Sequence, residues 1–494
     1  MGAKLVHGEH NNGPSRGKVH LGFPFFLKST AKERVRTEPR LTIFGDPNSP
    51  IMNFQRLGLL SAGLLMSVLA AAQTPQIAFE EYDLKNGMHV ILHEDHSTPI
   101  VAVTIMYHVG SKNEDPNRTG MAHFFEHLLF EGSENIGRGE FSRYVENAGG
   151  VLNANTTNDR TFYYELLPSN QLELGLWLES ERMLHAKVDI DGIETQREVV
   201  KEEKRLRVDN QPYGNLIAET MDRAYSEHPY RWTTIGSMEH LDAAQAEEFQ
   251  AFYKKFYVPN NATLSIAGDI DVAETKKLIQ KYFGGIPTGK ADILRPVNNE
   301  PTNPGEVRDT IMGDDQLPLV LQAYRIPEMD SEDYYAVDML NRILSTGESS
   351  RLNRSLVQDQ ELAMFAGAFS FGLEDPGLTL GFVMCNMGVD PLDVEQAFDT
   401  EVERVRTELV SEREFEKVRN QIENDFVSSN SRLAGIAESL ANYHVFYGNT
   451  SLINSEIEKY MAVTRDDLLR VAQKYYVNDN RVVLYFLYDE NTNE

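Results

Sequence analysis

Hydrophobic and polar positions in the first half of the chain follow two different periods. Strand-like alternation runs through MHVILHEDHSTPIVAVTIMYHVG, where Val101, Val103, Ile105 and Tyr107 fall on one face and predict a half-buried strand. The helical repeat predicts helices over 120–131, 139–148, 170–185 and 192–208, and strands are expected over 151–157 and 161–167. Strands mixed with helices in this order predict an α+β architecture of packed layers.

The same pattern occurs again near the C-terminus. In both places an amphipathic helix is followed by an aromatic pair with a valine, a polar turn and an apolar strand. The sequence KFYV at 255–258 matches KYYV at 474–477, which lies 219 positions later. A repeat of roughly 200–220 residues indicates an internal duplication.

Between the two copies lies GGIPTGKADILRPVNNEPTNPG, which contains four prolines and shows little periodicity. We therefore expect two homologous α/β-layered halves, 73–285 and 306–494, joined by a Pro/Gly-rich linker at 286–305. Two such halves could enclose a cavity, in the manner of a clam.

The segment 52–72, MNFQRLGLLSAGLLMSVLAAA, has the layout of a secretory signal peptide. Its only basic residue, Arg56, precedes an uncharged stretch from Leu57 to Ala72 that ends in small residues. That stretch is short for a transmembrane span, so we expect no stable membrane anchor after cleavage. The segment predicts bacterial export, to the periplasm or outside the cell.

Residues 1–51 precede this signal, and we interpret them as an upstream extension from a mis-assigned start, with translation beginning at Met52. The alternative is a basic organellar presequence, which would place the protein in the mitochondrion. Five basic residues gather there, at Lys28, Lys32, Arg34, Arg36 and Arg40. The lack of a clear amphipathic pattern favours the first interpretation.

Composition excludes some classes of function and of site. The formal net charge of -28 at pH 7 argues against binding of nucleic acid, because no basic stripe could offset it. The single cysteine, Cys385, excludes intrachain disulfides and any cysteine-ligated metal site.

The pentad HFFEH at 123–127 is a candidate metal site. On a helix His123 and His127 share one face because they are four residues apart, and Glu126 lies beside His127. Imidazole nitrogens at this spacing suit zinc, and a neighbouring carboxylate can take a proton from metal-bound water. The alternative is a pair of ordinary core histidines on an apolar helix.

A third ligand is expected from the helix over 192–208. Its apolar side is predicted to consist of Ile193, Val199, Val200 and Leu206. Glu203 lies near the centre of that side, whereas Glu202 is turned about 100° away toward the solvent. A carboxylate within a buried stripe needs a partner, and a zinc ion would supply one. Three ligands with an open fourth position favour catalysis over a purely structural role.

These residues resemble the insulinase and pitrilysin family of zinc metallopeptidases, which carry the inverted motif His-x-x-Glu-His. The glutamate of REVVKEE follows the pentad by 76 positions, as in the family. The segment GGVLNANTTNDRTFYY is similar to a second family motif, and the resemblance runs from about Ile77 to the end. It is nearest to the mitochondrial-processing-peptidase-like branch. The resemblance implies a Zn²⁺ cofactor bound by His123, His127 and Glu203, with Glu126 as the general base.

The resemblance also implies that the strand with Asn153 and Ala154 binds substrate. Alternating polar residues in VLNANTT suit an edge strand, to which an extended peptide could add through main-chain hydrogen bonds. The alternative is an ordinary covered edge strand. One position departs from the family, because Gln196 stands where an acidic residue usually precedes the ligand glutamate by seven positions.

The second half lacks the metal-binding pattern. Aligned on the glycines at 132 and 347, it has Asp338, Asn341 and Arg342 opposite the three polar residues of the pentad. It also lacks the Arg and Tyr that active family members present there, since Val357 and Met364 occupy those positions. We therefore predict a heterodimer with a homologous subunit that carries the Arg/Tyr pair. A homodimer with weak activity or unconventional substrate contacts is the alternative.

Taken together, the sequence predicts an exported zinc metalloendopeptidase that cleaves extended peptides in an enclosed chamber. Zinc-bound water activated by Glu126 would attack the peptide, and a partner subunit would complete the site. Three alternatives remain: a non-catalytic scaffold subunit like respiratory-complex core proteins, an organellar presequence-processing peptidase, and a peptide-binding module whose zinc is only structural.

Overall fold

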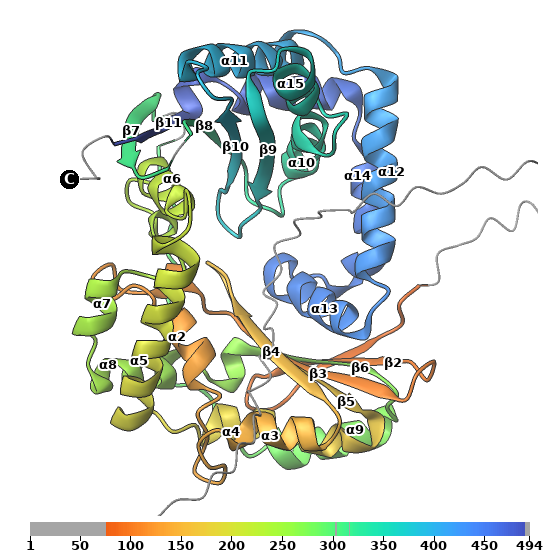
Figure 1. Cartoon of the computed structure of the whole chain (residues 1–494). Coiled ribbons are helices and arrows are strands. Elements are labelled where there is room, and N and C mark those ends of the chain that lie inside the picture. Colours follow the sequence, from red (N-terminus) through yellow and green to blue (C-terminus); the bar gives the residue numbers. More distant parts are fainter. Residues whose placement is uncertain (1–75, 302–303, 316, 490–494) are drawn as a thin grey trace, which may run out of the picture. The chain divides into compact units, whose positions relative to one another are not determined.

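The computed structural model describes residues 76–301, 304–315 and 317–489, which form two β-sheets with packed helices (Figure 1). The predicted extension at 1–51 and signal peptide at 52–72 lie outside these residues. Within the described ranges, every helix is too short or too polar to cross a membrane. The predicted α+β class with two sheet-bearing halves is confirmed.

The first half forms a six-stranded sheet in the order β1-β2-β6-β3-β5-β4. The strands are β1 Glu80–Asp83, β2 His89–Glu94, β3 Ile100–Tyr107, β4 Val151–Thr156, β5 Thr161–Pro168 and β6 Ala262–Gly268. The helices are α2 Met121–Leu128, α3 Glu140–Asn147, α4 Leu172–Leu184, α5 Ile190–Lys204, α6 Leu216–Ala224, α7 Met238–Ala243, α8 Ala246–Phe256 and α9 Val272–Phe283. The β4 strand lies at one edge of this sheet.

The second half forms a five-stranded sheet in the order β7-β11-β8-β10-β9. The strands are β7 Val307–Gly313, β8 Leu319–Arg325, β9 Ala363–Phe371, β10 Leu378–Cys385 and β11 Arg481–Tyr488. The helices are α10 Glu332–Ser345, α11 Pro391–Thr407, α12 Glu412–Ser429, α13 Leu433–Tyr447, α14 Glu456–Ala462 and α15 Arg465–Tyr475. With β1 set aside, both sheets have the same strand order, and in each sheet only the pair β2–β6 or β7–β11 is parallel. This shared topology is what a duplicated unit would produce.

Each half contributes one helix to the sheet of the other half (Figure 1). The α13 helix of the second half packs on β3 and β6, where Leu440 and Ala437 join the cluster that contains Ala102 and Ile91. The α6 helix of the first half packs on β8 and β11 of the second sheet. Apolar burial therefore links the two halves in both directions.

This exchange explains why one expectation about β3 was wrong. The alternating pattern predicted a half-buried strand, but both faces of β3 are buried beyond its first residue. Val103 and Ile105 face the helices of their own half, whereas Ala102 faces α13. The helix that covers this second face lies more than 300 positions later in the chain, so local periodicity could not reveal it.

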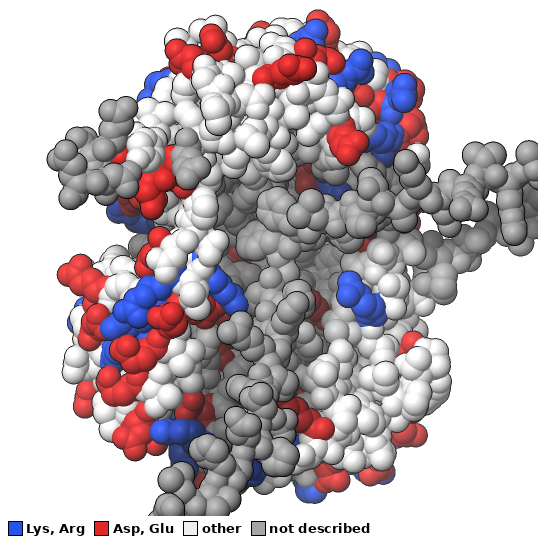
Figure 2. Space-filling model, in the orientation of Figure 1, with Lys and Arg blue, Asp and Glu red and all other residues white. Residues whose placement is uncertain are grey.

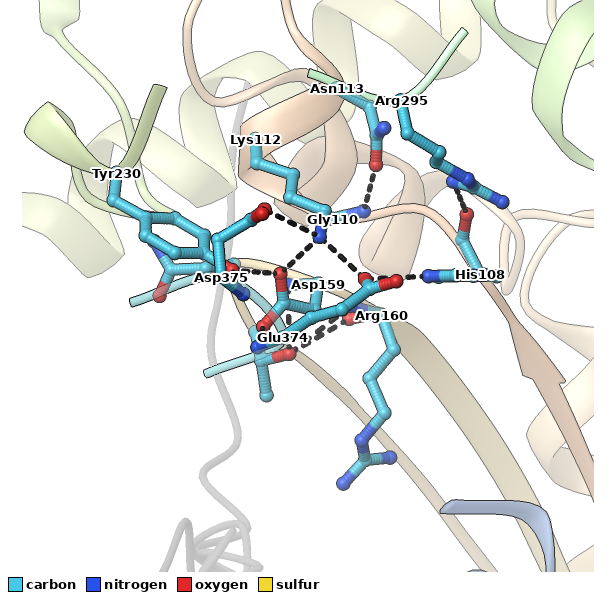
Figure 3. Close-up of polar contacts among 12 residues, drawn as sticks. His108, Gly110, Lys112, Asn113, Asp159, Arg160, Tyr230, Arg295, Glu374 and Asp375 are labelled. Carbon is cyan, nitrogen blue, oxygen red and sulfur yellow. Dashed lines mark hydrogen bonds and ion pairs between the residues drawn. The ribbon is translucent and has the colours of Figure 1, made fainter. Parts of the chain in front are cut away.

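A buried charge network also joins the halves, where the turn after β4 meets the turn between β9 and β10. Lys112 is 2% exposed, and its Nζ lies 2.8 Å from Asp159 Oδ1 and 2.5 Å from Glu374 Oε2. Asp375 is 3.4 Å away, and the Tyr230 hydroxyl donates to Asp159. Figure 3 shows the three carboxylates directed at the single ammonium group. One cation of the first half thus pairs with carboxylates of both halves.

Candidate metal centre

The α2 helix, which carries the pentad, is held at its N-terminus by a buried carboxylate. Gly120 adopts a left-handed φ of 93° before the helix begins, a conformation that suits glycine. Glu114 accepts hydrogen bonds from the backbone N–H groups of Gly120 and Ala122 at 2.9 and 2.8 Å. These bonds satisfy donors that a helix start leaves without partners.

The other end of α2 is held by a buried arginine from α4. Arg182 is 1% exposed and donates from Nη1 to the backbone oxygen of Leu129 at 3.1 Å. Glu179 and Glu165 accept from the same guanidinium at 3.0 and 3.3 Å, so its charge is paired. Sequence reasoning missed Arg182 and Glu114, although Arg182 was detectable as a cation within the apolar stretch LELGLWLESERML.

The structure brings His123, His127 and Glu203 together. Glu203 Oε2, from α5, lies 3.0 Å from His127 Nε2 and 3.7 Å from His123 Nε2. One ligand atom from each of the three residues lies within 4.8 Å of the other two. The second oxygen, Glu203 Oε1, pairs with Arg207 at 2.7 Å, which leaves Oε2 facing the histidines.

The electrostatics of the three side chains suit a metal ion. Burial, together with the neighbouring His127, lowers the pKa of His123 to about 4, so this imidazole is neutral at pH 7. Burial alone would raise the pKa of Glu203, but the hydrogen bond with His127 and the basic groups around it, including Arg207, hold that pKa below its usual value. A neutral imidazole and an ionised carboxylate are the forms that bind zinc. Two imidazole nitrogens and one carboxylate oxygen fit a site with an open fourth position.

The buried side of α5 differs in part from the expectation. Ile193 and Val200 are buried, but Val199 is 45% exposed and Leu206 is 55% exposed. The α-helix ends at Lys204 and continues as a wider π-helical turn, so Leu206 does not follow the 3.6-residue repeat. Glu203 still faces inward because it follows Val200 by three positions.

Glu126 is buried beside the ligand set and is held by a residue of the edge strand. The Thr156 hydroxyl donates to Glu126 Oε2 at 2.7 Å. Burial raises the pKa of Glu126, whereas the hydrogen bond from Thr156 and the charge of His127 lower it. Thr156, the last residue of β4, is a further candidate that sequence reasoning did not single out.

Asn153 and Ala154 lie on opposite faces of β4, because successive side chains of a strand alternate. Ala154 is 2% exposed and belongs to the core of the first half, on the same face as Thr156. The Asn153 side chain therefore points away from the face that carries Thr156. Gln196, the position that departs from the family, donates to Glu131 Oε1 at 2.5 Å.

In the second half, the positions of the expected Arg/Tyr pair differ in their surroundings. Val357 lies in the π-helical segment Asn353–Asp359 and packs at the margin of the core. Met364 lies on the edge strand β9 and is 59% exposed. Of the nearby arginines, Arg351 is paired with Glu414 at 2.8 Å.

Acidic and basic side chains are mixed on the surface over α5 rather than separated into patches (Figure 2). Lys201 pairs with Asp242 at 2.8 Å and Arg205 pairs with Glu202 at 3.2 Å. Glu202 is thus a surface residue, as predicted from the helical repeat.

Two protein-family models match this chain. One is described as insulinase (peptidase family M16) and matches residues 89–236, which include the whole pentad and Glu203. The other is described as the peptidase M16 inactive domain and matches residues 243–422. The division agrees with a second half that lacks the metal-binding pattern.

Similar proteins are known from bacteria and from eukaryotes. Zinc protease PqqE of Helicobacter pylori is 30% identical over 437 residues, which cover 87% of this chain and 98% of that protein. The crystal structure of a protease from Helicobacter pylori has a TM-score of 0.79 at 28% identity and covers 83% of this chain and 99% of its own. The mitochondrial-processing peptidase subunit beta of Lentinula edodes is more distant, at 26% identity over 79% of this chain and 86% of its own. The chain therefore belongs to the insulinase family of zinc proteases, peptidase family M16.

Proposed function

We propose that this protein is a metalloendopeptidase that hydrolyses extended peptides at the centre formed by α2 and α5. The observation that carries the proposal is the buried carboxylate of Glu126, held by Thr156, beside two histidines and Glu203. A structural metal site needs no general base, whereas this arrangement provides one next to three ligands. His123, His127 and Glu203 would hold zinc.

Zinc in this position supplies Lewis-acid chemistry, which polarises a carbonyl oxygen and makes water a stronger nucleophile. Glu126 takes the proton from the attacking water and passes it to the amine nitrogen of the leaving peptide. The hydrogen bond from Thr156 to Oε2 fixes the carboxylate in one orientation, with Oε1 available for the proton. Burial of Glu126 excludes bulk water from this transfer.

We further propose that substrate binds along β4. This strand is at the edge of the sheet, so a peptide can add to it through main-chain hydrogen bonds. The strand ends at Thr156, which contacts the proposed base, and a peptide on β4 would thus lead to the centre. In this proposal Asn153 and Ala154 contribute mainly their backbone, and the Asn153 side chain can bind substrate on the other face. An enclosed chamber around the peptide stays a prediction.

The substitution Glu126→Gln tests the proposed mechanism. The variant should retain zinc, because the substitution leaves all three ligands in place, and should lose peptide hydrolysis by about 100-fold or more. Zinc content by elemental analysis and cleavage of a quenched fluorescent peptide measure the two properties. Unchanged turnover would contradict the role of Glu126, and a zinc-bearing wild type without peptidase activity would support a scaffold role.

A partner subunit completes the proposal. The described second half offers Val357 and exposed Met364 where a substrate-binding Arg and Tyr are expected, so a homologous chain would supply that pair. This arrangement corresponds to the zinc-bearing subunit of the heterodimeric, mitochondrial-processing-peptidase-like branch. Expression of this chain alone and together with a homologous chain encoded beside it tests the idea. Full activity of the single chain would contradict it.

Export through the segment 52–72 is also proposed, on the sequence pattern alone. Sequencing of the mature N-terminus separates the two routes. A chain that begins at Gln73 supports export by a signal peptide, and cleavage elsewhere within an organelle supports the presequence-processing alternative.

A further inference from the structure

A second cluster with metal-ligand chemistry lies away from α2, where the first sheet meets α13. We call it the β1–α13 cluster; its members are Glu81, Asp83, His89 and His444. The register of β1 and β2 pairs Asp83 with His89 and places Glu81 two residues along the same strand. Side chains two apart on a strand share a face, so these three side chains share the face that α13 covers.

The contacts orient His89 as a ligand. Its Nδ1 lies 2.8 Å from Asp83 Oδ1, and its Nε2 lies 3.3 Å from Glu81 Oε2. A hydrogen bond between one ring nitrogen and a carboxylate is the usual support of a metal-binding histidine, because it directs the other nitrogen at the ion. Asp83 would be this supporting residue and Glu81 the neighbouring ligand.

The fourth residue, His444, has no hydrogen bond from either ring nitrogen to any described residue. Its ring stacks on that of His89, with 3.5 Å between the centroids and 1° between the planes. One ligand atom from each of Glu81, His89 and His444 lies within 4.8 Å of the other two. Among the described residues, only this cluster and the centre on α2 and α5 meet that criterion.

We propose that the β1–α13 cluster is a second metal site, for a divalent transition-metal ion of the zinc type. A donor set of two imidazoles and one carboxylate favours ions of this type over calcium or magnesium, which prefer oxygen ligands. In the stacked arrangement the nitrogens do not point at one common position, so binding rotates the His444 ring, which no hydrogen bond to a described residue holds in place. Glu81 is also bonded by the Thr450 hydroxyl at 2.5 Å, which holds its carboxylate near the rings.

This site is distinct in role from the catalytic one. Glu81 and His89 belong to the first sheet and His444 belongs to a helix of the second half, so a bound ion ties the two halves together. The ion would stabilise the packing of α13 on β3 and β6 by binding only the folded chain. The expected consequence is a gain in stability without participation in hydrolysis.

Zinc titration of the full chain tests the proposal, with bound metal counted by elemental analysis after removal of excess ion. Wild type should bind two zinc ions per chain, and His444→Gln should bind one. Loss of the first centre through His123→Gln and His127→Gln should leave one ion, together with a zinc-dependent rise in melting temperature. This count does not depend on hydrolysis, so it stands apart from the test of the proposed function.

A matched control comes from His96, which also lies between two carboxylates, Glu94 at 2.9 Å and Asp269 at 2.6 Å, but has no second histidine. His96→Gln should still bind two ions. If His444→Gln does not fold, Glu81→Gln serves in its place and should bind one ion. The proposal would be overturned if the chain with His123→Gln and His127→Gln bound no ion. It would also be overturned if His444→Gln and Glu81→Gln both bound as many ions as wild type, which would leave only an ion-paired surface histidine.

Discussion

The two halves contain equivalent pairs of packed helices. The side chains that face each other across the two pairs differ in their chemistry. In the first half α2 packs on α5, and His127 of α2 faces Glu203 of α5 at 3.0 Å. In the second half α10 packs on α12, and Arg342, which aligns with His127, faces Asp425 of α12 at 2.7 Å. A basic side chain meets a carboxylate across the helix pair in both cases.

The two helix pairs differ in whether their facing side chains balance each other's charge without a bound ion. The Arg342 guanidinium is permanently charged and also binds Asp338, one turn earlier on α10, at 3.0 Å. In the first half His123 is neutral at pH 7 and carries no charge to balance the Glu203 carboxylate. An added cation would therefore stabilise this group of side chains more than it would the Arg342 pair. The same pair of packed helices can therefore carry either a proposed metal centre or a salt bridge. A few substitutions account for the difference between the two halves.

The largest expected effect comes from removing Glu203, the carboxylate of the proposed metal-binding helix pair α2 and α5. Glu203→Gln should weaken zinc binding and lower activity by more than about 100-fold, since loss of even an outer-shell partner costs 10–100-fold. Glu202→Gln is the matched control, because its side chain is 57% exposed and, among the residues that the structure describes, forms an ion pair only with Arg205. Equal zinc content in both variants would contradict the assignment of Glu203 as a ligand.

A second large effect concerns the junction of the halves, where Lys112 binds carboxylates from both. Lys112→Met should lower the free energy of unfolding by about 3–5 kcal/mol, because it leaves the buried Asp159 carboxylate without its cation and removes one partner of Glu374. Chemical denaturation measures this change. Lys201→Met removes a surface pair with Asp242 and should change stability by less than about 1 kcal/mol. If Lys112→Met and Lys201→Met lowered the free energy of unfolding equally, the charge network around Lys112 would not hold the halves together.

The same junction predicts a dependence of stability on pH. Burial raises the pKa of Glu374, but the hydrogen bond from His108 and the charges of His108 and Lys112 lower it to about 2. A carboxylate with a lowered pKa contributes stability above its unfolded-state value of 4.5, and that contribution is lost as the pH falls toward 2. Denaturation at several pH values should show this loss in wild type and a smaller one in Lys112→Met.

The fold class and the duplication could be predicted because their signals are local. Helical and strand periods mark single elements, and the motif KFYV/KYYV marks the repeat. The helix exchange between α6 and α13 could not be predicted, since it depends on contacts between distant segments. For the same reason β3 was expected to be half-buried.

For the candidate site, helix phase singled out Glu203, which the structure places beside both histidines. The supporting reasons were partly wrong, because Val199 and Leu206 are exposed. Thr156 lies within the segment GGVLNANTTNDRTFYY, but neither its role nor that of Arg182 was predicted, since each depends on which backbone or carboxylate the fold brings near. That the three residues bind zinc stays a prediction until metal is measured.

A moderate effect is expected from the support of the proposed base. Thr156→Val keeps the size of the side chain and removes the hydrogen bond to Glu126, so activity should fall roughly tenfold, the equivalent of about 1.4 kcal/mol. Zinc content should not change. Thr156→Ser retains the hydroxyl and should recover most of the activity. If the serine variant were as impaired as the valine variant, packing of β4 and not the hydrogen bond would be responsible.

The smallest effect is expected in the second half, where a salt bridge occupies the position equivalent to the proposed metal centre. Arg342→Leu removes its bonds to Asp338 and Asp425 and should lower the free energy of unfolding by about 1 kcal/mol, because Asp425 is 58% exposed and the more buried Asp338 keeps the hydrogen bond from the Tyr460 hydroxyl. Peptidase activity and zinc content should stay at the wild-type level, since α10 contributes nothing to the centre on α2 and α5. A variant that lost zinc would show that the two helix pairs are coupled, and that the second half does more than keep the scaffold of the first.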